Sequence, residues 1–253
     1  MNAIRRTWTT AALALSAAAI STGARADQVV PNANASTAGD TDNRFPLLTS
    51  GGMRYQQVFD SSQFSSFGGP QLINEIDLRN GIFLHEAFTA TIADIQISLS
   101  TTSKAPDGLS TTFASNVGAD ATQVYSGSLT ISSTDAAGPG NTHVFDIAIH
   151  FQNPFLYDPS TGNLLLDIAN LSGAGSAIGS DFFDAVHGTG TGDAVSRVAG
   201  AEGSPGATTG TADSLGLIVQ FQTAPVPEPS SLALCGLGAL ALAGYARRRR
   251  ARA

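Results

Sequence analysis

The side chains best suited to proton transfer or metal binding are few in this chain of 253 residues. Its four histidines are His85, His143, His150 and His187. None stands in an H-E-x-x-H arrangement, and the spacing between them indicates no shared metal. The single cysteine, Cys235, lies in an apolar run, and the chain has no G-x-S-x-G sequence, so no catalytic nucleophile is indicated. We therefore expect no enzymatic activity.

Two pairs of acids resemble the paired carboxylates of glycoside hydrolases. They are Glu75 with Asp77, and Asp181 with Asp184. Glu75 and Asp77 would share one face of a strand, because side chains two residues apart point the same way. The chain is rich in acidic residues, so the sequence favours a solvated acidic face over a catalytic pair.

The sequence Asp40-Thr41-Asp42-Asn43 spaces oxygen atoms as the start of a calcium loop would. The glycine and the distal glutamate of such a loop are missing, so the pattern favours a solvated turn. Asp40 and Asp42 are the only candidate metal ligands that we take from the sequence, with Ca²⁺ as the ion. No other cofactor is expected.

The formal net charge of −7 hides a more acidic central segment. Residues 27–226 hold only five of the 13 basic residues but 19 of the 20 acidic ones, which gives this segment a formal net charge of −14. Such a segment repels phosphate backbones, so we expect no binding to nucleic acid.

Both ends of the chain have the pattern of targeting segments. Arg5 and Arg6 precede the apolar residues 11–20, and Ala24-Arg25-Ala26 is an A-x-A cleavage site, so residues 1–26 are predicted to be a secretory signal helix. The paired arginines also fit the start of a twin-arginine signal, but the rest of that motif is absent.

At the other end, the run at residues 230–246 carries no charge and is long enough for about 25 Å of helix. This is slightly short of a typical hydrocarbon core of about 30 Å, so we predict one transmembrane helix that only just spans. Arg247, Arg248, Arg249 and Arg250 follow at once and act as a membrane stop signal that stays in the cytoplasm. Everything before Val226 is then placed outside.

The tripeptide Pro227-Glu228-Pro229, the apolar run and the arginine cluster together resemble the PEP-CTERM sorting signal of Gram-negative bacteria. The resemblance implies that an exosortase cleaves near this tripeptide. It also implies that the protein is held only transiently at the inner membrane and then reaches the cell surface or the extracellular matrix. The setting typical of the family is exopolysaccharide and biofilm.

Between the targeting segments, short apolar stretches alternate with Gly, Pro, Ser and Asn clusters. Residues 145, 147, 149 and 151 are all apolar, and this period of two indicates strands with one face on a core. The eight predicted strands cover residues 55–59, 72–78, 88–99, 123–131, 143–151, 163–169, 181–186 and 215–221. With no βαβ rhythm, they predict a single all-β, antiparallel, jelly-roll-like sandwich at residues 54–225. Residues 27–53 are expected to be a flexible mature N-terminus, and residues 226–253 the sorting tail.

Two local features complete the prediction. Pro159 and Gly162 favour a chain reversal, so the strands on either side are expected to form a hairpin. Residues 173–216 are rich in Gly, Ser, Ala and Thr, which indicates long surface loops or a weakly ordered connection before the last strand.

The sequence thus favours an exported structural or interaction protein of the cell surface or matrix. The alternative is a carbohydrate-binding module, with Ca²⁺ or without, or a carbohydrate-active one, since a sandwich can hold a sugar in a concave site. Convergence of Tyr55, Tyr125 and Tyr157 on one cleft would favour the alternative.

Overall fold

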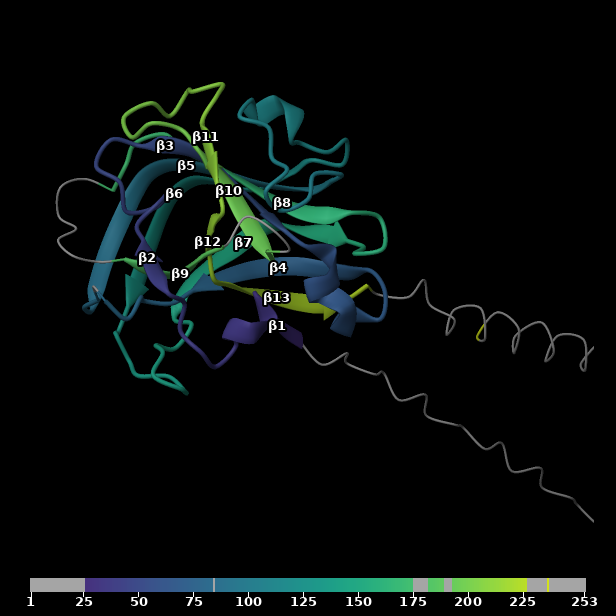
Figure 1. Ribbon diagram of the computed structural model, residues 1–253, viewed down its shortest axis with the longest axis horizontal. Coiled ribbons are helices and arrows are strands. Elements are labelled where there is room, and N and C mark those ends of the chain that lie inside the picture. The colour runs from purple at the N-terminus through teal and green to yellow at the C-terminus, as the bar shows by residue number, and fades with distance from the viewer. Residues whose placement is uncertain (1–25, 84, 175–181, 189–192, 227–235, 237–253) are drawn as a thin grey trace, which may run out of the picture. The chain divides into compact units, whose positions relative to one another are not determined.

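The computed structural model describes residues 26–83, 85–174, 182–188, 193–226 and 236 (Figure 1). The described chain is built from strands, with three short 3₁₀ helices, η1 (Asn32–Asn34), η2 (Ser61–Phe67) and η3 (Phe113–Ser115). The strands are β1 (Ala26–Val30), β2 (Thr41–Asn43), β3 (Met53–Phe59), β4 (Gln71–Leu78), β5 (Phe88–Thr102), β6 (Thr122–Ser133), β7 (Ile147–Tyr157), β8 (Asn163–Asn170), β9 (Phe183–His187), β10 (Val195–Ala199), β11 (Thr211–Asp213), β12 (Leu215–Leu217) and β13 (Val219–Pro225).

The strands form three antiparallel sheets. A four-stranded sheet has the order β1-β13-β4-β7, and a six-stranded sheet has the order β11-β10-β3-β8-β5-β6. The third sheet is small, with the order β12-β9-β2. The predicted all-β antiparallel fold is therefore confirmed, in a sandwich-like arrangement that includes a third sheet.

One hydrophobic core joins the sheets. Phe59 on β3 and Phe221 on β13 belong to the two larger sheets, and their rings meet edge to face with centroids 5.0 Å apart. Phe183 on β9 is also fully buried in this core. A smaller apolar cluster around Phe113 and Leu165 lies apart from the main core. Since the apolar positions of one strand face recur every second residue, the alternation in the sequence was enough to place most of the longer strands.

All eight predicted strands are present; their ends shift by up to four residues, except that β7 runs six residues past its predicted end. The last one is divided, because the chain passes from β12 in the small sheet to β13 in the four-stranded sheet at Ile218. Ile147 and Ile149 on β7 are fully buried, whereas the next residue, His150, is exposed, as the alternating pattern predicted.

The expectation of a flexible segment at residues 27–53 is wrong. β1 pairs with β13 from Ala26↔Thr223 to Val30↔Val219, and β2 pairs with β9. Leu47 and Leu48 are buried in the main core. These pairings are long-range, so the polar composition of the segment gave no sign of them. The described part of the folded unit extends over residues 26–226.

The predicted hairpin around Pro159 is also wrong, although the chain does reverse there. The Thr161 amide donates to the Asp158 carbonyl at 3.0 Å, and Gly162 has φ 152°, which favours glycine. The strand before the turn, β7, pairs with β4, whereas the strand after it, β8, pairs with β3 and β5. The turn therefore connects two sheets.

In residues 173–216 the structure adds two strands, β10 and β11, where long loops were expected, to the predicted strands that correspond to β9 and β12. β10 lies between β3 and β11, and four of its five residues are buried. A strand that is buried on both faces shows no alternation, which hid β10 among the glycines. Residues 175–181 and 189–192 lie outside the described residues.

Within the described part of the chain, no helix has the length and apolar character that crossing a membrane requires. The predicted signal helix and the predicted transmembrane helix at residues 230–246 lie outside the described residues, apart from Ala26 and Gly236.

Candidate functional site

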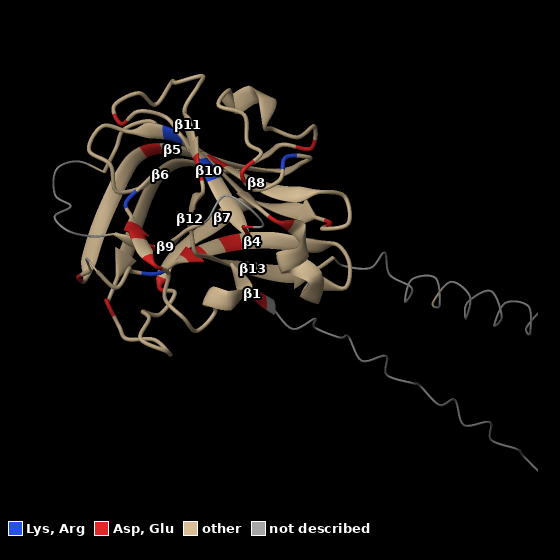
Figure 2. Cartoon of the chain, viewed as in Figure 1, with Lys and Arg blue, Asp and Glu red and all other residues tan. Residues whose placement is uncertain are grey.

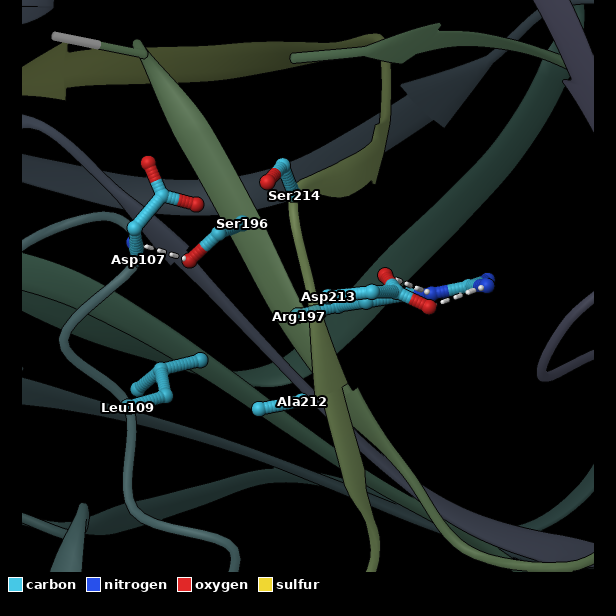
Figure 3. Close-up of a pocket in the computed structure, with 7 residues that line it drawn as sticks. All are labelled: Asp107, Leu109, Ser196, Arg197, Ala212, Asp213 and Ser214. Carbon is cyan, nitrogen blue, oxygen red and sulfur yellow. Dashed lines mark hydrogen bonds and ion pairs between the residues drawn. The ribbon is translucent and has the colours of Figure 1, made fainter. Parts of the chain in front are cut away.

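The clearest hollow of the described surface lies beside β10 and β11 (Figure 3). It has a volume of about 180 Å³, below the range of roughly 300–1,000 Å³ typical of small-molecule sites. Its lining consists of Asp107, Leu109, Ser196, Arg197, Ala212, Asp213 and Ser214. A wider hollow of about 520 Å³ shares Arg197 and Asp213 with it and extends to Phe45 and Glu202.

Arg197, which lines both hollows, already forms an ion pair with Asp213. Arg197 Nε donates to Asp213 Oδ1 at 2.8 Å, and Nη2 donates to Oδ2 at 3.0 Å. The guanidinium also lies 5.6 Å from the ring of Phe45, whose ring is approached by Arg44 as well, at 5.9 Å. A ring with two guanidiniums on it is poorly placed to stack on a sugar, so this region gives the carbohydrate alternative no support.

The three tyrosines named for a sugar site do not converge on a cleft. Tyr55 and Tyr157 are fully buried, and the Tyr157 hydroxyl donates to the Gly162 carbonyl at 2.9 Å. The Tyr125 hydroxyl donates to the Ser128 carbonyl at 2.6 Å on β6. Burial raises the pKa of both Tyr55 and Tyr157, as expected for phenols inside a core.

The two calcium candidates serve as acceptors for separate backbone amides. Asp40 Oδ1 accepts from the His187 amide at 2.7 Å, and Asp42 Oδ2 accepts from the Phe83 amide at 3.0 Å. Asp42 lies within β2. The expected solvated turn is therefore wrong at Asp42, because pairing with β9 extends the chain there; a calcium site at these residues stays a prediction.

Glu75 and Asp77 do share a strand face, but it is not a solvated one. They are only 7% and 3% exposed on β4. Asp77 accepts from Gln222 Nε2 at 2.8 Å, and Glu75 pairs with His150 Nδ1 at 2.9 Å. Burial, helped by the nearby Glu75 carboxylate, raises the pKa of Asp77 to about 7.

Of the second acid pair, Asp181 lies outside the described residues, whereas Asp184 is part of a buried ion pair. Asp184 Oδ2 accepts from Arg79 Nε at 2.8 Å, and both side chains are 1% exposed. Arg79 Nη2 also donates to the carbonyls of Asn34 and Thr37, each at 2.9 Å. This pair fastens the N-terminal segment to the sheets, which gives it a structural role.

Two of the four histidines, His85 and His143, lie together in the structure, although their spacing in the sequence indicated no shared metal. His85 and His143 lie 58 positions apart, yet their ring centroids are 4.3 Å apart. Both rings approach the carboxylate of Asp135, which the sequence analysis did not single out. Within the described residues, these three form the one group of three His, Cys, Asp or Glu whose potential ligand atoms all lie within 4.8 Å of one another. No local spacing reveals this group, because two separate connections bring it together.

The acidic residues are spread over the whole folded unit rather than gathered in one hollow (Figure 2). β13, its last strand, ends at Pro225 and is followed by Val226. A comparison with protein families matches residues 225–250 to the PEP-CTERM protein-sorting motif. The chain carries a PEP-CTERM sorting signal. Neither the curated proteins nor the solved structures contain a match to the chain.

The PEP-CTERM motif starts where the folded unit ends. It covers the tripeptide Pro227, Glu228 and Pro229 and the four arginines from Arg247 to Arg250, all of which lie outside the described residues, as does Ala24 of the predicted signal cleavage site. The motif supports an exported protein that is processed by an exosortase, as the sequence resemblance implied.

Proposed function

We propose that this protein is a structural or interaction component of the cell surface or extracellular matrix, delivered there when an exosortase cuts near Pro227-Glu228-Pro229. The observation that carries the proposal is the position of the sorting motif. It begins at residue 225, at the end of β13, after every strand of the three sheets has been completed. Cleavage at the tripeptide would therefore release the folded unit whole.

The folded unit suits a role in binding rather than in catalysis. Its long strands enclose one main apolar core, and its formal net charge of −14 keeps it soluble among acidic polymers. We assign no reaction to it. Its partners on this proposal are exopolysaccharide or other matrix components, with the inner membrane as a transient site of attachment.

The sorting step is tested by Glu228→Ala in cells that produce the protein. We expect the variant to stay at full length in the membrane fraction, whereas the wild-type protein is shortened and released. The matched control is Ser231→Ala, which changes a neighbouring residue outside the tripeptide and should be processed normally. Normal size and release of Glu228→Ala, seen by immunoblotting of both fractions, would contradict the proposal.

The role of the folded unit is tested by exchange. Residues 27–226 are replaced by an unrelated secreted domain, and the signal and the sorting tail are kept. We expect the hybrid to be processed as before but the cohesion of the extracellular matrix to fall to the level of a deletion strain. Unchanged cohesion with the hybrid would show that the folded unit has no matrix role.

A further inference from the structure

Three side chains from two connections meet at one end of the four-stranded sheet. His85 lies between β4 and β5, and Asp135 and His143 lie between β6 and β7. The second connection is a well-built hairpin: the Val144 amide donates to the Ala136 carbonyl at 3.0 Å, and the Gly138 amide donates to the Thr142 carbonyl at 2.7 Å. Asp135 and His143 therefore face each other from its two arms.

The distances suit a small ion held by three ligands. His85 Nδ1 and His143 Nε2 lie 3.1 Å and 3.3 Å from the same oxygen, Asp135 Oδ1. Ligands of a tetrahedral zinc ion, each about 2.0–2.1 Å from the metal, are separated from one another by about 3.3–3.5 Å. Small rotations of the side chains would bring the three atoms to that spacing.

The Asp135 carboxylate is held in place by a buried neighbour. Asn80, which is fully buried, donates from Nδ2 to Asp135 Oδ1 at 2.8 Å. The Asp135 amide donates to Ser133 Oγ at 3.0 Å, and Asp135 has φ 57°, in the left-handed region that few residues other than glycine adopt. Groups that orient a ligand in this way are typical of metal sites.

A simple Asp–His hydrogen bond explains only half of this arrangement. His85 Nδ1 lies within 3.1 Å of both carboxylate oxygens, and His143 points at the same carboxylate, with its ring tilted by 49° against that of His85. The Nδ1 atom of His143 is buried and has no hydrogen-bond partner. A cation held between His85 Nδ1, His143 Nε2 and the Asp135 carboxylate engages all three groups at once.

We propose that His85, Asp135 and His143 bind one divalent transition-metal ion, with Zn²⁺ the best match. Two imidazoles and a carboxylate suit zinc and its neighbours in the first transition row, whereas Ca²⁺ and Mg²⁺ prefer sites made of oxygen atoms. His85 is 37% exposed, so the ion reaches the site from solvent and keeps a position open for a further ligand. The ion ties the β4–β5 connection to the β6–β7 hairpin. This proposal does not depend on the matrix role.

The test uses the full chain, purified in detergent and stripped of metal with a chelator. A ligand that binds only the native state raises the melting temperature, so we expect Zn²⁺ to raise it and calorimetric titration to give one ion per chain. Ca²⁺ at the same concentration should have no effect. His85→Ala should weaken Zn²⁺ binding at least tenfold, and His150→Ala, which removes a histidine that is 76% exposed, should leave it unchanged.

Loss of the hairpin in a His143 variant would be mistaken for loss of a ligand, so a second measurement avoids unfolding. Co²⁺ replaces Zn²⁺ and gives visible absorption bands whose intensity reports coordination. We expect the wild-type bands to be lost in His85→Ala and changed in the shape-conserving Asp135→Asn. Wild-type protein that shows no Zn²⁺-dependent shift, or His85→Ala that binds Zn²⁺ and Co²⁺ like the wild type, would overturn the proposal.

Discussion

Asp184 and Asp77 are both buried carboxylates close to β4, but their partners differ. Asp184 contacts the guanidinium of Arg79 and accepts from the Gly39 amide at 2.9 Å. Asp77 lies beside the Glu75 carboxylate and accepts from the side chain of Gln222. Burial raises the pKa of both, but only at Asp184 does the charge of an arginine act against it. Asp184 therefore holds an arginine in place, whereas Asp77, which has no arginine beside it, takes up a proton near neutral pH.

The largest expected loss of stability comes from breaking the ion pair of Arg79 and Asp184. Asp184→Asn leaves the Arg79 guanidinium buried without its counter-charge, although it keeps nearly the same shape. Removing one partner of a buried ion pair costs about 3–5 kcal/mol. We expect the free energy of unfolding to fall by that amount in urea titrations, and we expect residues 31–40 to lose their protection in hydrogen exchange.

The matched control is the double variant Arg79→Met/Asp184→Leu, which removes both charges. It should recover much of the lost stability, because the buried charge is gone as well. If Asp184→Asn is as stable as the wild type, the ion pair of Arg79 and Asp184 does not hold the N-terminal segment in place.

A second expected effect is the pH dependence that Asp77 confers. Its pKa is raised from 3.8 to about 7 in the folded protein, so between these values the native state holds a proton that the unfolded chain has released. The contribution of Asp77 to stability therefore falls as pH rises from about 4 to about 7 and changes little above that. Three pKa units correspond to about 4 kcal/mol, and solvent screening reduces the expected loss to about 2 kcal/mol.

This prediction is checked by urea unfolding at a series of pH values. Asp77→Asn should flatten the curve over the same interval, since the amide does not titrate. Asp94→Asn, at an exposed aspartate of β5, is the control and should keep the wild-type slope. A wild-type curve that rises steadily from pH 4 to pH 7 would show that Asp77 is ionised in the folded protein, like an ordinary surface acid.

Much of this scaffold could be predicted from the sequence, because alternation of apolar residues is a local signal. The pairing of β1 with β13, and the contact of Arg79 with residues 34–37, could not be predicted, since they join segments far apart in the chain. The same reason hid the candidate metal site. His85 and His143 are brought together by the way β4–β5 and β6–β7 connect, and neither connection has a metal-binding spacing of its own.

Glu75 and Asp77 also show that alternation predicts which residues share a strand face but not whether that face is buried. Alternation placed Glu75 and Asp77 on one side of β4 correctly, but it did not reveal that this side is covered. Arg79, two residues further, lies 4.6 Å from the ring of Phe145 in the β6–β7 connection and contacts residues 34–37. The two acids themselves contact polar side chains of the neighbouring strands, Asp77 with Gln222 on β13 and Glu75 with His150 on β7.

The smallest expected loss of stability comes from breaking an exposed ion pair, Arg44 with Glu202, and it shows how much burial adds to pairing. Arg44 Nη2 lies 2.8 Å from Glu202 Oε2, as close as Arg79 lies to Asp184, but the Arg44 side chain is 44% exposed. Water and salt screen such a pair, and ordering its long side chain costs entropy, so Arg44→Ala should lower the free energy of unfolding by less than about 1 kcal/mol. Added salt should erase even this difference, whereas the cost of Asp184→Asn should persist. A loss at Arg44 as large as that at Asp184 would mean that pairing alone, and not burial, decides how strongly an arginine and an acid hold this fold together.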